Sequence, residues 1–306
     1  MSKDLIVVFY AYDYRKRAGN NISDQKSKKE IYLKNAACTL VSAKHYNPNV
    51  DVALITNTDL PRKFQAVFSK NDIKVFNEPY DDFLFEDCPW TLAFYRFNAL
   101  THILKKYSQY ERIIMLECDM YVQSDLKNVF IECEQNILLH DLEHSLDNGS
   151  YKGFLDEVEK FIGSKTFMVQ YEGGFLAINR AMAIHFDAEC HKIYEKMRQT
   201  SFVSKYGDMF ILSLAAYALK DKVKNAAAYV HIFWTGWFRH VSTCYEKDPV
   251  CVLHVPDEKE RGMIKVFDRY ILKNKFPSNR KVWKIFQFKH KNFKNYISGI
   301  ILKRKS

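Results

Sequence analysis

Two acidic residues separated by a single position follow an apolar run near the middle of the chain. The run spans residues 113–116, and Glu117 and Asp119 come directly after it in the stretch IIMLECDMYV. A short continuous apolar run is typical of a strand buried on both faces. Because side chains alternate along an extended chain, we expect both acids to point the same way. Their mutual repulsion favours a cation between them; the alternative is a solvated strand end whose acids share no ligand.

A divalent cation held by these acids predicts chemistry on a diphosphate. The hard cations Mg²⁺ and Mn²⁺ take oxygen ligands, and as Lewis acids they neutralise a nucleotide diphosphate when it leaves a sugar. We expect Asp119 to coordinate the cation directly. Glu117 is expected to bind the metal or the ribose hydroxyls of the nucleotide.

The surrounding pattern predicts an α/β sheet that positions these acids. Strand-like apolar runs alternate with amphipathic or apolar helical runs, which is typical of strands joined by helices. Pro89 is expected at the first turn of a helix, where proline is tolerated. The predicted strands are 5–11, 52–56, 73–76 and 113–116, with strand-like runs also around Glu172 and His254; the predicted helices are 30–45, 61–70, 89–107, 181–198 and 208–219.

Composition divides the 306 residues into a near-neutral body and a basic tail. Residues 269–306 contain twelve Lys and Arg and no Asp or Glu, so residues 1–268 hold 34 basic and 36 acidic side chains. The 47% hydrophobic content is sufficient for a large core. No run approaches the roughly 20 apolar residues of a membrane span. The seven scattered cysteines form no C-x-x-C pair, which favours reduced thiols and a cytoplasmic protein.

The tail is expected to form a basic amphipathic helix. Its apolar and aromatic residues recur at steps of three and four, which places them on one stripe. Such a helix favours the surface of an anionic membrane, here the inner face. A helix docked on the body is the alternative, and nucleic acid is disfavoured because the body has no extended basic face. The stripe comprises Trp283, Phe286, His290, Phe293, Ile297 and Ile300.

The stretch LECDMYVQSDL (116–126) resembles the L-D-x-D-x-x-V-x-x-D-L segment of glycosyltransferases with the GT-A fold. It is most similar to the retaining family 8 type, which includes bacterial lipopolysaccharide galactosyl- and glucosyltransferases. Here Glu117 replaces the first Asp. Further segments follow in the family's order, over roughly residues 4–268: FYRFNAL (94–100), YEGGFLAIN (171–179), GDMFILSL (207–214) and LHVPDEKERGM (253–263).

The resemblance implies a Rossmann-like GT-A domain with a mostly parallel central sheet over residues 1–268. It also implies transfer of a sugar, with retention, from a nucleotide-sugar donor such as a UDP-sugar. The acceptor would be a glycan or lipid-linked glycan, such as a lipopolysaccharide or capsule precursor. Two rivals remain. A sugar-1-phosphate nucleotidyltransferase usually has a G-G-x-G-T-R loop that AYDYRKRAGNN lacks, and a glycan-binding protein on a transferase fold would show no turnover.

By resemblance His254 supplies the third metal ligand, and an imidazole favours Mn²⁺ over Mg²⁺. The alternatives are a histidine satisfied at a strand end, or ligation by His231 or His240 instead. Arg96 and Lys259 are expected at the donor; alternatively, Arg96 is a solvated or paired surface arginine and Lys259 a charge in the loop DEKER.

Glu172 stands where the family has Asn, before two glycines that allow close approach of backbone or ligand. Its carboxylate could stabilise an oxocarbenium-like transition state or position the acceptor hydroxyl. Asp208 occupies the position of an Asp that contacts sugar or acceptor in the family, and Met209 replaces the Gln after it. The nucleophile is therefore left open.

The end of the first strand, Ala11, Tyr12 and Asp13, is expected by resemblance to hold the nucleotide base, with Tyr12 stacking on it. Trp234 and Trp237 are expected in the core, with a sugar platform as the alternative.

Overall fold

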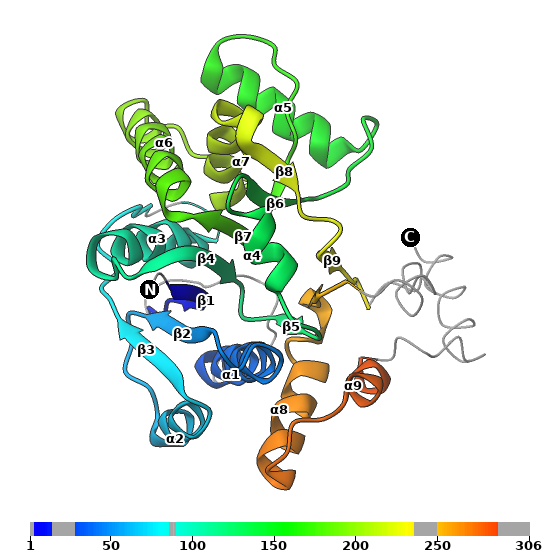
Figure 1. Ribbon diagram of the computed structural model, residues 1–306. Helices are drawn as coiled ribbons and strands as arrows, with labels where there is room; N and C mark the ends of the chain where they lie inside the picture. Colours follow the sequence, from blue (N-terminus) through cyan, green and yellow to red (C-terminus); the bar gives the residue numbers. More distant parts are fainter. Residues whose placement is uncertain (1–2, 14–27, 86–87, 89, 236–249, 287–306) are drawn as a thin grey trace, which may run out of the picture.

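The computed structural model describes residues 3–13, 28–85, 88, 90–235 and 250–286 (Figure 1). A seven-stranded sheet with the order β3-β2-β1-β4-β7-β6-β8 forms its centre, and a three-stranded sheet with the order β5-β10-β9 adjoins it. The strands are β1 (Lys3–Tyr10), β2 (Asp51–Thr56), β3 (Ile73–Asn77), β4 (Tyr110–Leu116), β5 (Met120–Val122), β6 (Ile137–Asp141), β7 (Tyr171–Asn179), β8 (Val223–Asn225), β9 (Val230–Ile232) and β10 (Val252–His254).

The central sheet is mostly parallel, which confirms the predicted fold class. β1, β2, β3 and β4 run in one direction, while β7 lies antiparallel to both β4 and β6. The register of β7 places its glycines beside the end of β4, where the Glu117 amide donates to the Gly174 carbonyl at 3.0 Å. One antiparallel strand thus brings the predicted Glu172 segment to the predicted acidic segment.

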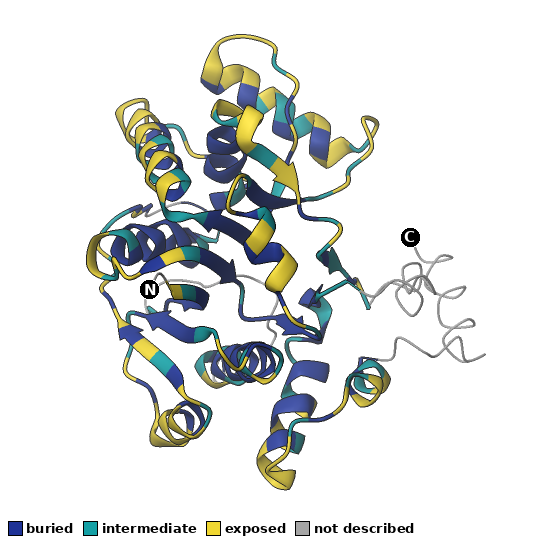
Figure 2. Cartoon of the chain, in the orientation of Figure 1, coloured by how far each residue is buried: buried dark blue, intermediate teal, exposed yellow. Residues whose placement is uncertain are grey.

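Helices cover both faces of this sheet, which explains why its strands are apolar on both sides (Figures 1 and 2). Leu5, Val7 and Phe9 of β1 face a core shared with α3, α5, α6 and α7, and the residues between them face α1, α2, α4 and α8. The helices are α1 (Lys28–Tyr46), α2 (Arg62–Lys70), α3 (Tyr95–Lys106), α4 (Lys127–Glu132), α5 (Gly149–Ile162), α6 (Arg180–Gln199), α7 (Asp208–Ala218), α8 (Gly262–Lys273) and α9 (Asn279–Ile285).

Most predicted elements appear within a few residues of their expected bounds. The predicted helix over 89–107 differs, because the short 3₁₀ helix η1 (Thr91–Phe94) precedes α3, and Pro89 lies outside the described residues. Several helices and strands were not predicted from the sequence: β5, α4, β6, α5, β8, β9 and α8. Of these, α5 carries clear end signals: Asn148 caps its first turn by accepting from the amides of Ser150 and Tyr151, and Gly163 ends it in the left-handed region at φ 89°.

The start of the predicted tail packs against the small sheet. Helix α8 continues across the predicted boundary at residue 268, and Val282 and Phe286 are buried with Tyr121 of β5. The Trp283 indole donates to the Gln123 side chain at 2.8 Å. Residues 287–306, with His290, Phe293, Ile297 and Ile300, lie outside the described residues. The division into a body and a membrane-associating tail stays a prediction.

Among the helices that the structure describes, none combines the length and the apolar character that crossing a bilayer requires.

A row of buried polar side chains on α1 holds the acidic segment in place. The Thr39 hydroxyl lies 2.6 Å from the Cys118 carbonyl and 2.5 Å from the Met120 carbonyl, which flank Asp119. Further along the helix, Ser42 accepts from the Val122 amide at 3.1 Å. These contacts involve a carbonyl of the turn before β5 and backbone groups of β5 itself, which is an edge strand of the small sheet. The predicted strand end is therefore anchored to Thr39 of α1, which precedes the two carbonyl groups by 79 and 81 residues.

Thr39→Val should lower the free energy of unfolding by about 1–3 kcal/mol, because the single hydroxyl proton shared by these buried carbonyl groups is lost. The matched control is Thr200→Val, which removes a hydroxyl that bonds the Lys196 carbonyl at 2.8 Å on an exposed helix end. Urea unfolding followed by circular dichroism measures both variants. Equal losses of less than about 0.5 kcal/mol, the size of a surface substitution, would contradict the anchoring role.

Candidate active site

The acidic segment borders a cleft at the carboxyl ends of the parallel strands. Glu117 and Asp119 follow β4, and Ala11 and Tyr12 follow the neighbouring strand β1. All four line a cleft of about 420 Å³, together with Lys259. In open α/β sheets, ligands bind in the crevice outside the carboxyl ends of the strands.

Three of the predicted ligands meet at one point. Glu117, Asp119 and His254 can each offer one ligand atom, and these atoms lie within 4.8 Å of one another. The His254 Nε2 atom lies 3.3 Å from Asp119 Oδ2 and 3.5 Å from Glu117 Oε2. Strand β10 brings His254 here, because its antiparallel pairing with β5 sets His254 opposite Met120.

This donor set fits a divalent cation. Asp119 Oδ2 and His254 Nε2 are buried, and neither forms a well-aligned hydrogen bond with the described residues. Buried polar atoms are almost always hydrogen-bonded. Within the described part of the chain these two atoms have only ion-pair contacts, with each other, with Glu117 and with Lys259, so they are available to a cation. Two carboxylates and an imidazole are ligands of Mn²⁺ and related ions. The two acids therefore share one site, as the spacing predicted, and His254 joins them.

The charges around the two acids set their pKa values apart. Burial alone would raise the pKa of Asp119, but Lys259 Nζ at 2.9 Å and the His254 imidazole hold it well below its usual range. Burial and the charge of Asp119 raise the pKa of Glu117 to about 7, against the opposing effect of Arg96. At neutral pH Asp119 is thus ionised, whereas Glu117 is close to its titration point.

The Glu172 carboxylate lies between two imidazoles. Its Oε2 atom is 3.1 Å from Nδ1 of His254 and accepts from the Gly174 amide at 2.9 Å. Its Oε1 atom is 3.4 Å from Nδ1 of His140. Burial would raise the pKa of Glu172, yet the two histidines hold it below its usual range. Glu172 also lines the cleft. It can therefore fix the orientation of His254, whose other nitrogen faces the acids.

Arg96 is a buried partner of the acids, so its solvated alternative is wrong. Its side chain lies over the Phe9 ring, with Nε 3.2 Å from Asp208 Oδ2 and Nη2 3.4 Å from Glu117 Oε1. A Cβ atom at Gly173 would collide with the guanidinium, so only glycine allows this approach. Burial raises the pKa of Asp208, while Arg96 opposes that shift. Arg96 therefore contacts two of the acids that line the cleft, Glu117 and Asp208, and holds them in place.

The residues predicted to hold the nucleotide follow β1, on the other side of β4 from Glu172 of β7, and Tyr12 among them lines the cleft. The Tyr12 amide donates to Asn57 Oδ1 at 2.8 Å, which fixes the segment after β1. Lys29 Nζ lies 4.9 Å from the centre of the Tyr12 ring. Asp13 follows in the same segment and is half-buried. Base stacking on Tyr12 stays a prediction.

Two tryptophans were expected in the core, and two histidines were alternative ligands of the metal. Trp234 is 40% exposed and lines the cleft, so its expected core position is wrong. His231 does not join the acids: its group contains His140 and Glu143 instead. Trp237 and His240 lie outside the described residues.

His140, which lies 3.4 Å from Glu172, was not predicted from the sequence. The stretch ILLHDLEH (137–144) carried the same signal as the acidic segment, an apolar run that ends in residues able to bind metal. Tyr32 of α1, which lines the cleft, was not predicted either. Burial raises the pKa of Tyr32 to about 12, with Lys259 opposing the shift.

Comparison with known proteins finds relatives of the fold only. No family model and no curated protein matches the sequence. A crystal structure of the galactosyltransferase LgtC with donor and acceptor sugar analogs is similar, with a TM-score of 0.53, 16% identity, and coverage of 82% of this chain and 86% of that one. A structure of an active-site mutant of LgtC gives 0.52 and 17%, with the same coverage. Mouse xyloside xylosyltransferase 1 gives 0.54 and 10%, covering 83% of this chain and 97% of that one.

The chain therefore has the GT-A fold of glycosyltransferases, and its fold resembles that of the family 8 enzymes. It is similar in structure to a galactosyltransferase and to a xylosyltransferase. Because the sequence identities are only 10 to 17%, this similarity is limited to the fold.

Glu117→Gln should make the metal-free chain more stable relative to its parent as the pH rises from 4.5 to above 7. The parent carboxyl has a folded pKa of about 7 against 4.5 as its ordinary value, so the folded state binds the extra proton and loses stability as that proton leaves. Glutamine has no proton to lose. Urea unfolding at several pH values in the presence of a chelator measures the difference.

The matched control is Glu111→Gln, an exposed acid at the start of the same strand, which should follow the parent at every pH. A stability difference between Glu117→Gln and the parent that is flat over this pH range would contradict the burial and repulsion assigned to Glu117.

Proposed function

We propose that the chain is a metal-dependent glycosyltransferase that moves a sugar from a nucleotide-sugar donor, a UDP-sugar in the first instance, to a glycan or lipid-linked glycan acceptor. The proposed acceptor class includes precursors of lipopolysaccharide or of a capsule. Retention of configuration belongs to the proposal and is supported only by the resemblance in sequence.

One observation carries the proposal. On a GT-A fold, Glu117, Asp119 and His254 converge beside Lys259 at the edge of a cleft large enough for a nucleotide sugar. A cleft with convergent polar groups and perturbed pKa values is the usual position of an active site. The galactosyltransferase LgtC, which has a similar fold, was crystallised with donor and acceptor sugar analogs.

The donor is proposed to lie along the cleft from Tyr12 to Lys259. Tyr12 would stack on the base, and the Lys259 ammonium would meet the diphosphate, because it already lies beside an acid at the metal site. A Mn²⁺ or Mg²⁺ ion held by Glu117, Asp119 and His254 would neutralise the charge that develops on the leaving nucleotide diphosphate.

The two remaining carboxylates are proposed to have different roles. Glu172 is directed at His254 and His140, so we assign it the orientation of His254 in preference to direct contact with the sugar. Asp208 lines the cleft at the N-terminus of α7, and Arg96 lies within 3.2 Å of it. It is the carboxylate best placed to contact the sugar or to position the acceptor hydroxyl. Its neighbour Met209 also lines the cleft.

Asp119→Asn should reduce metal-dependent hydrolysis of the donor by a factor of ~100 or more, because it removes the charge that holds the cation. A thermal-shift screen of UDP-, GDP- and CMP-sugars with Mn²⁺ first identifies the donor, and release of the nucleotide measures turnover. The matched control is Asp125→Asn, an exposed acid six residues further along the same stretch, which should retain parental turnover.

Three results would contradict the proposal. If the parent binds sugars but hydrolyses no donor, a glycan-binding protein is the better description. If it forms a nucleotide sugar from a sugar 1-phosphate and a nucleoside triphosphate, it is a nucleotidyltransferase. If Asp119→Asn hydrolyses donor as fast as Asp125→Asn, the metal site has been placed wrongly.

We further propose that residues 287–306 bring the enzyme to the cytoplasmic face of an anionic membrane. This segment contains six Lys and Arg and no Asp or Glu. The helices α8 and α9 before it pack on the body, so the proposed membrane contact is confined to the residues after Phe286.

A chain that ends at Phe286 should lose binding to anionic vesicles and keep its fold and its donor hydrolysis. Each Lys or Arg near an anionic surface contributes about 1 kcal/mol, and binding of the full chain should weaken as salt screens these charges. Co-sedimentation of both chains with anionic and with neutral vesicles measures this. Equal pelleting of the two chains with anionic vesicles would contradict the membrane role.

A further inference from the structure

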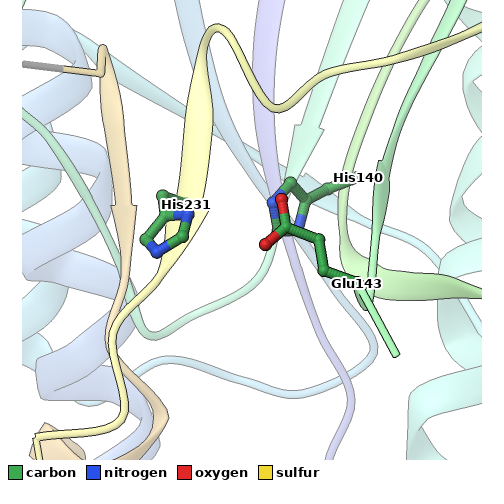
Figure 3. Close-up of side chains that lie close together, drawn as sticks. All are labelled: His140, Glu143 and His231. Carbon is green, nitrogen blue, oxygen red and sulfur yellow. The ribbon is translucent and has the colours of Figure 1, made fainter. Parts of the chain in front are cut away.

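A second group of potential metal ligands lies beside the Glu172 oxygen that faces away from His254. His140 is at the end of β6, Glu143 is in the loop that follows, and His231 is in the middle of β9. One ligand atom from each lies within 4.8 Å of the others. Figure 3 shows the two imidazoles and the Glu143 carboxylate directed toward a common space between the strands.

His140 provides the observation that points to a ligand. Its side chain is 2% exposed, and neither ring nitrogen makes a well-aligned hydrogen bond with the described residues. Nδ1 lies 3.4 Å from the Glu172 carboxylate, so Nε2 is the nitrogen available to the space shared with Glu143 and His231. An imidazole with one nitrogen at a carboxylate and the other at a cation is the usual arrangement of a metal-binding histidine.

We propose that His140, Glu143 and His231 form a second metal site, which binds Zn²⁺. Two imidazoles and one carboxylate suit Zn²⁺, and a fourth tetrahedral position remains for water or a substrate group. Ligands around a tetrahedral Zn²⁺ at about 2.1 Å are about 3.4 Å apart, so atoms within 4.8 Å need only small side-chain rotations to close on the ion.

The two sites differ in chemistry and share one support. The Glu117 and Asp119 site has two carboxylates and suits a harder ion, whereas the second site has two imidazoles and selects a softer one. Glu172 places one oxygen beside Nδ1 of His254 and the other beside Nδ1 of His140. A single buried carboxylate thus orients one histidine of each site.

The position of the second site indicates what Zn²⁺ would do. It would join the β6–α5 loop to β9, and β9 pairs with β10, the strand that carries His254. The neighbouring residues Leu142, His144 and Ile232 line the cleft. The ion would therefore fix the cleft wall opposite the nucleotide side, whether or not the chain transfers a sugar.

The test uses the full chain without a histidine tag, stripped of metal, in an Asp119→Asn background that disables the first site. Zn²⁺ is titrated against a colorimetric chelator, and Co²⁺ is titrated separately because tetrahedral Co²⁺ is visible by its d–d absorption. We expect one bound equivalent and a tetrahedral Co²⁺ spectrum. Adding Glu143→Gln should weaken Zn²⁺ at least about 10-fold, and adding His231→Asn should do the same, because each removes one of three ligands.

The control is Glu159→Gln, an exposed acid on α5, which should bind Zn²⁺ as tightly as the Asp119→Asn background. At the same Zn²⁺ concentration, Zn²⁺ should also raise the melting temperature of the background by more than that of the Glu143→Gln double variant, since stabilisation by a ligand falls as its affinity falls. The proposal is overturned if the background binds no Zn²⁺, or if Glu143→Gln and His231→Asn both bind it as tightly as the Glu159→Gln control.

Discussion

Four carboxylates buried at one end of the central sheet set the main constraint on this structure. Glu117, Asp119, Glu172 and Asp208 are all close to the same few strand ends, where their mutual repulsion and lost hydration oppose folding. Each one is therefore paired with a basic side chain from another part of the chain. The pairing is also uneven, since Glu117 keeps a pKa of about 7, and that residual imbalance is what a divalent cation would relieve. The partners are Arg96, His140, His254 and Lys259.

Several elements of the fold fix the backbone segments that carry these charged side chains. Helix α1 places Thr39 against the turn that carries Asp119, and its Asn35 side chain donates to the Lys259 carbonyl at 2.9 Å. The small sheet brings His254 in from the far end of the sequence. Gly173 leaves room for the Arg96 guanidinium. A site held by a helix, two sheets and a glycine is preorganised, which is what charge stabilisation in a transition state requires.

A GT-A fold supplies the cleft, and this chain's own residues determine what the cleft can bind. The proposed donor site and the proposed zinc site lie on either side of Glu172, so metal occupancy on one side can affect the histidine on the other. The basic segment after Phe286 is separate from both in sequence. The proposed membrane contact and the proposed metal and donor sites are thus in different parts of the chain, so each can be tested separately.

The local pattern of the sequence was enough to determine the α/β class, most helices and strands, and the acidic segment, because buried strands and amphipathic helices have characteristic periods. Resemblance added His254, Lys259 and Asp208 to that segment. Sequence alone could not show that β7 runs antiparallel, that Glu172 faces two histidines, or that His231 joins His140 and not the acids. Those facts depend on strand order and on pairing between β9 and β10, which join segments far apart in the chain. Long-range pairing leaves no local periodic signal, so only the tertiary structure decided which histidine lies beside which acidic residues.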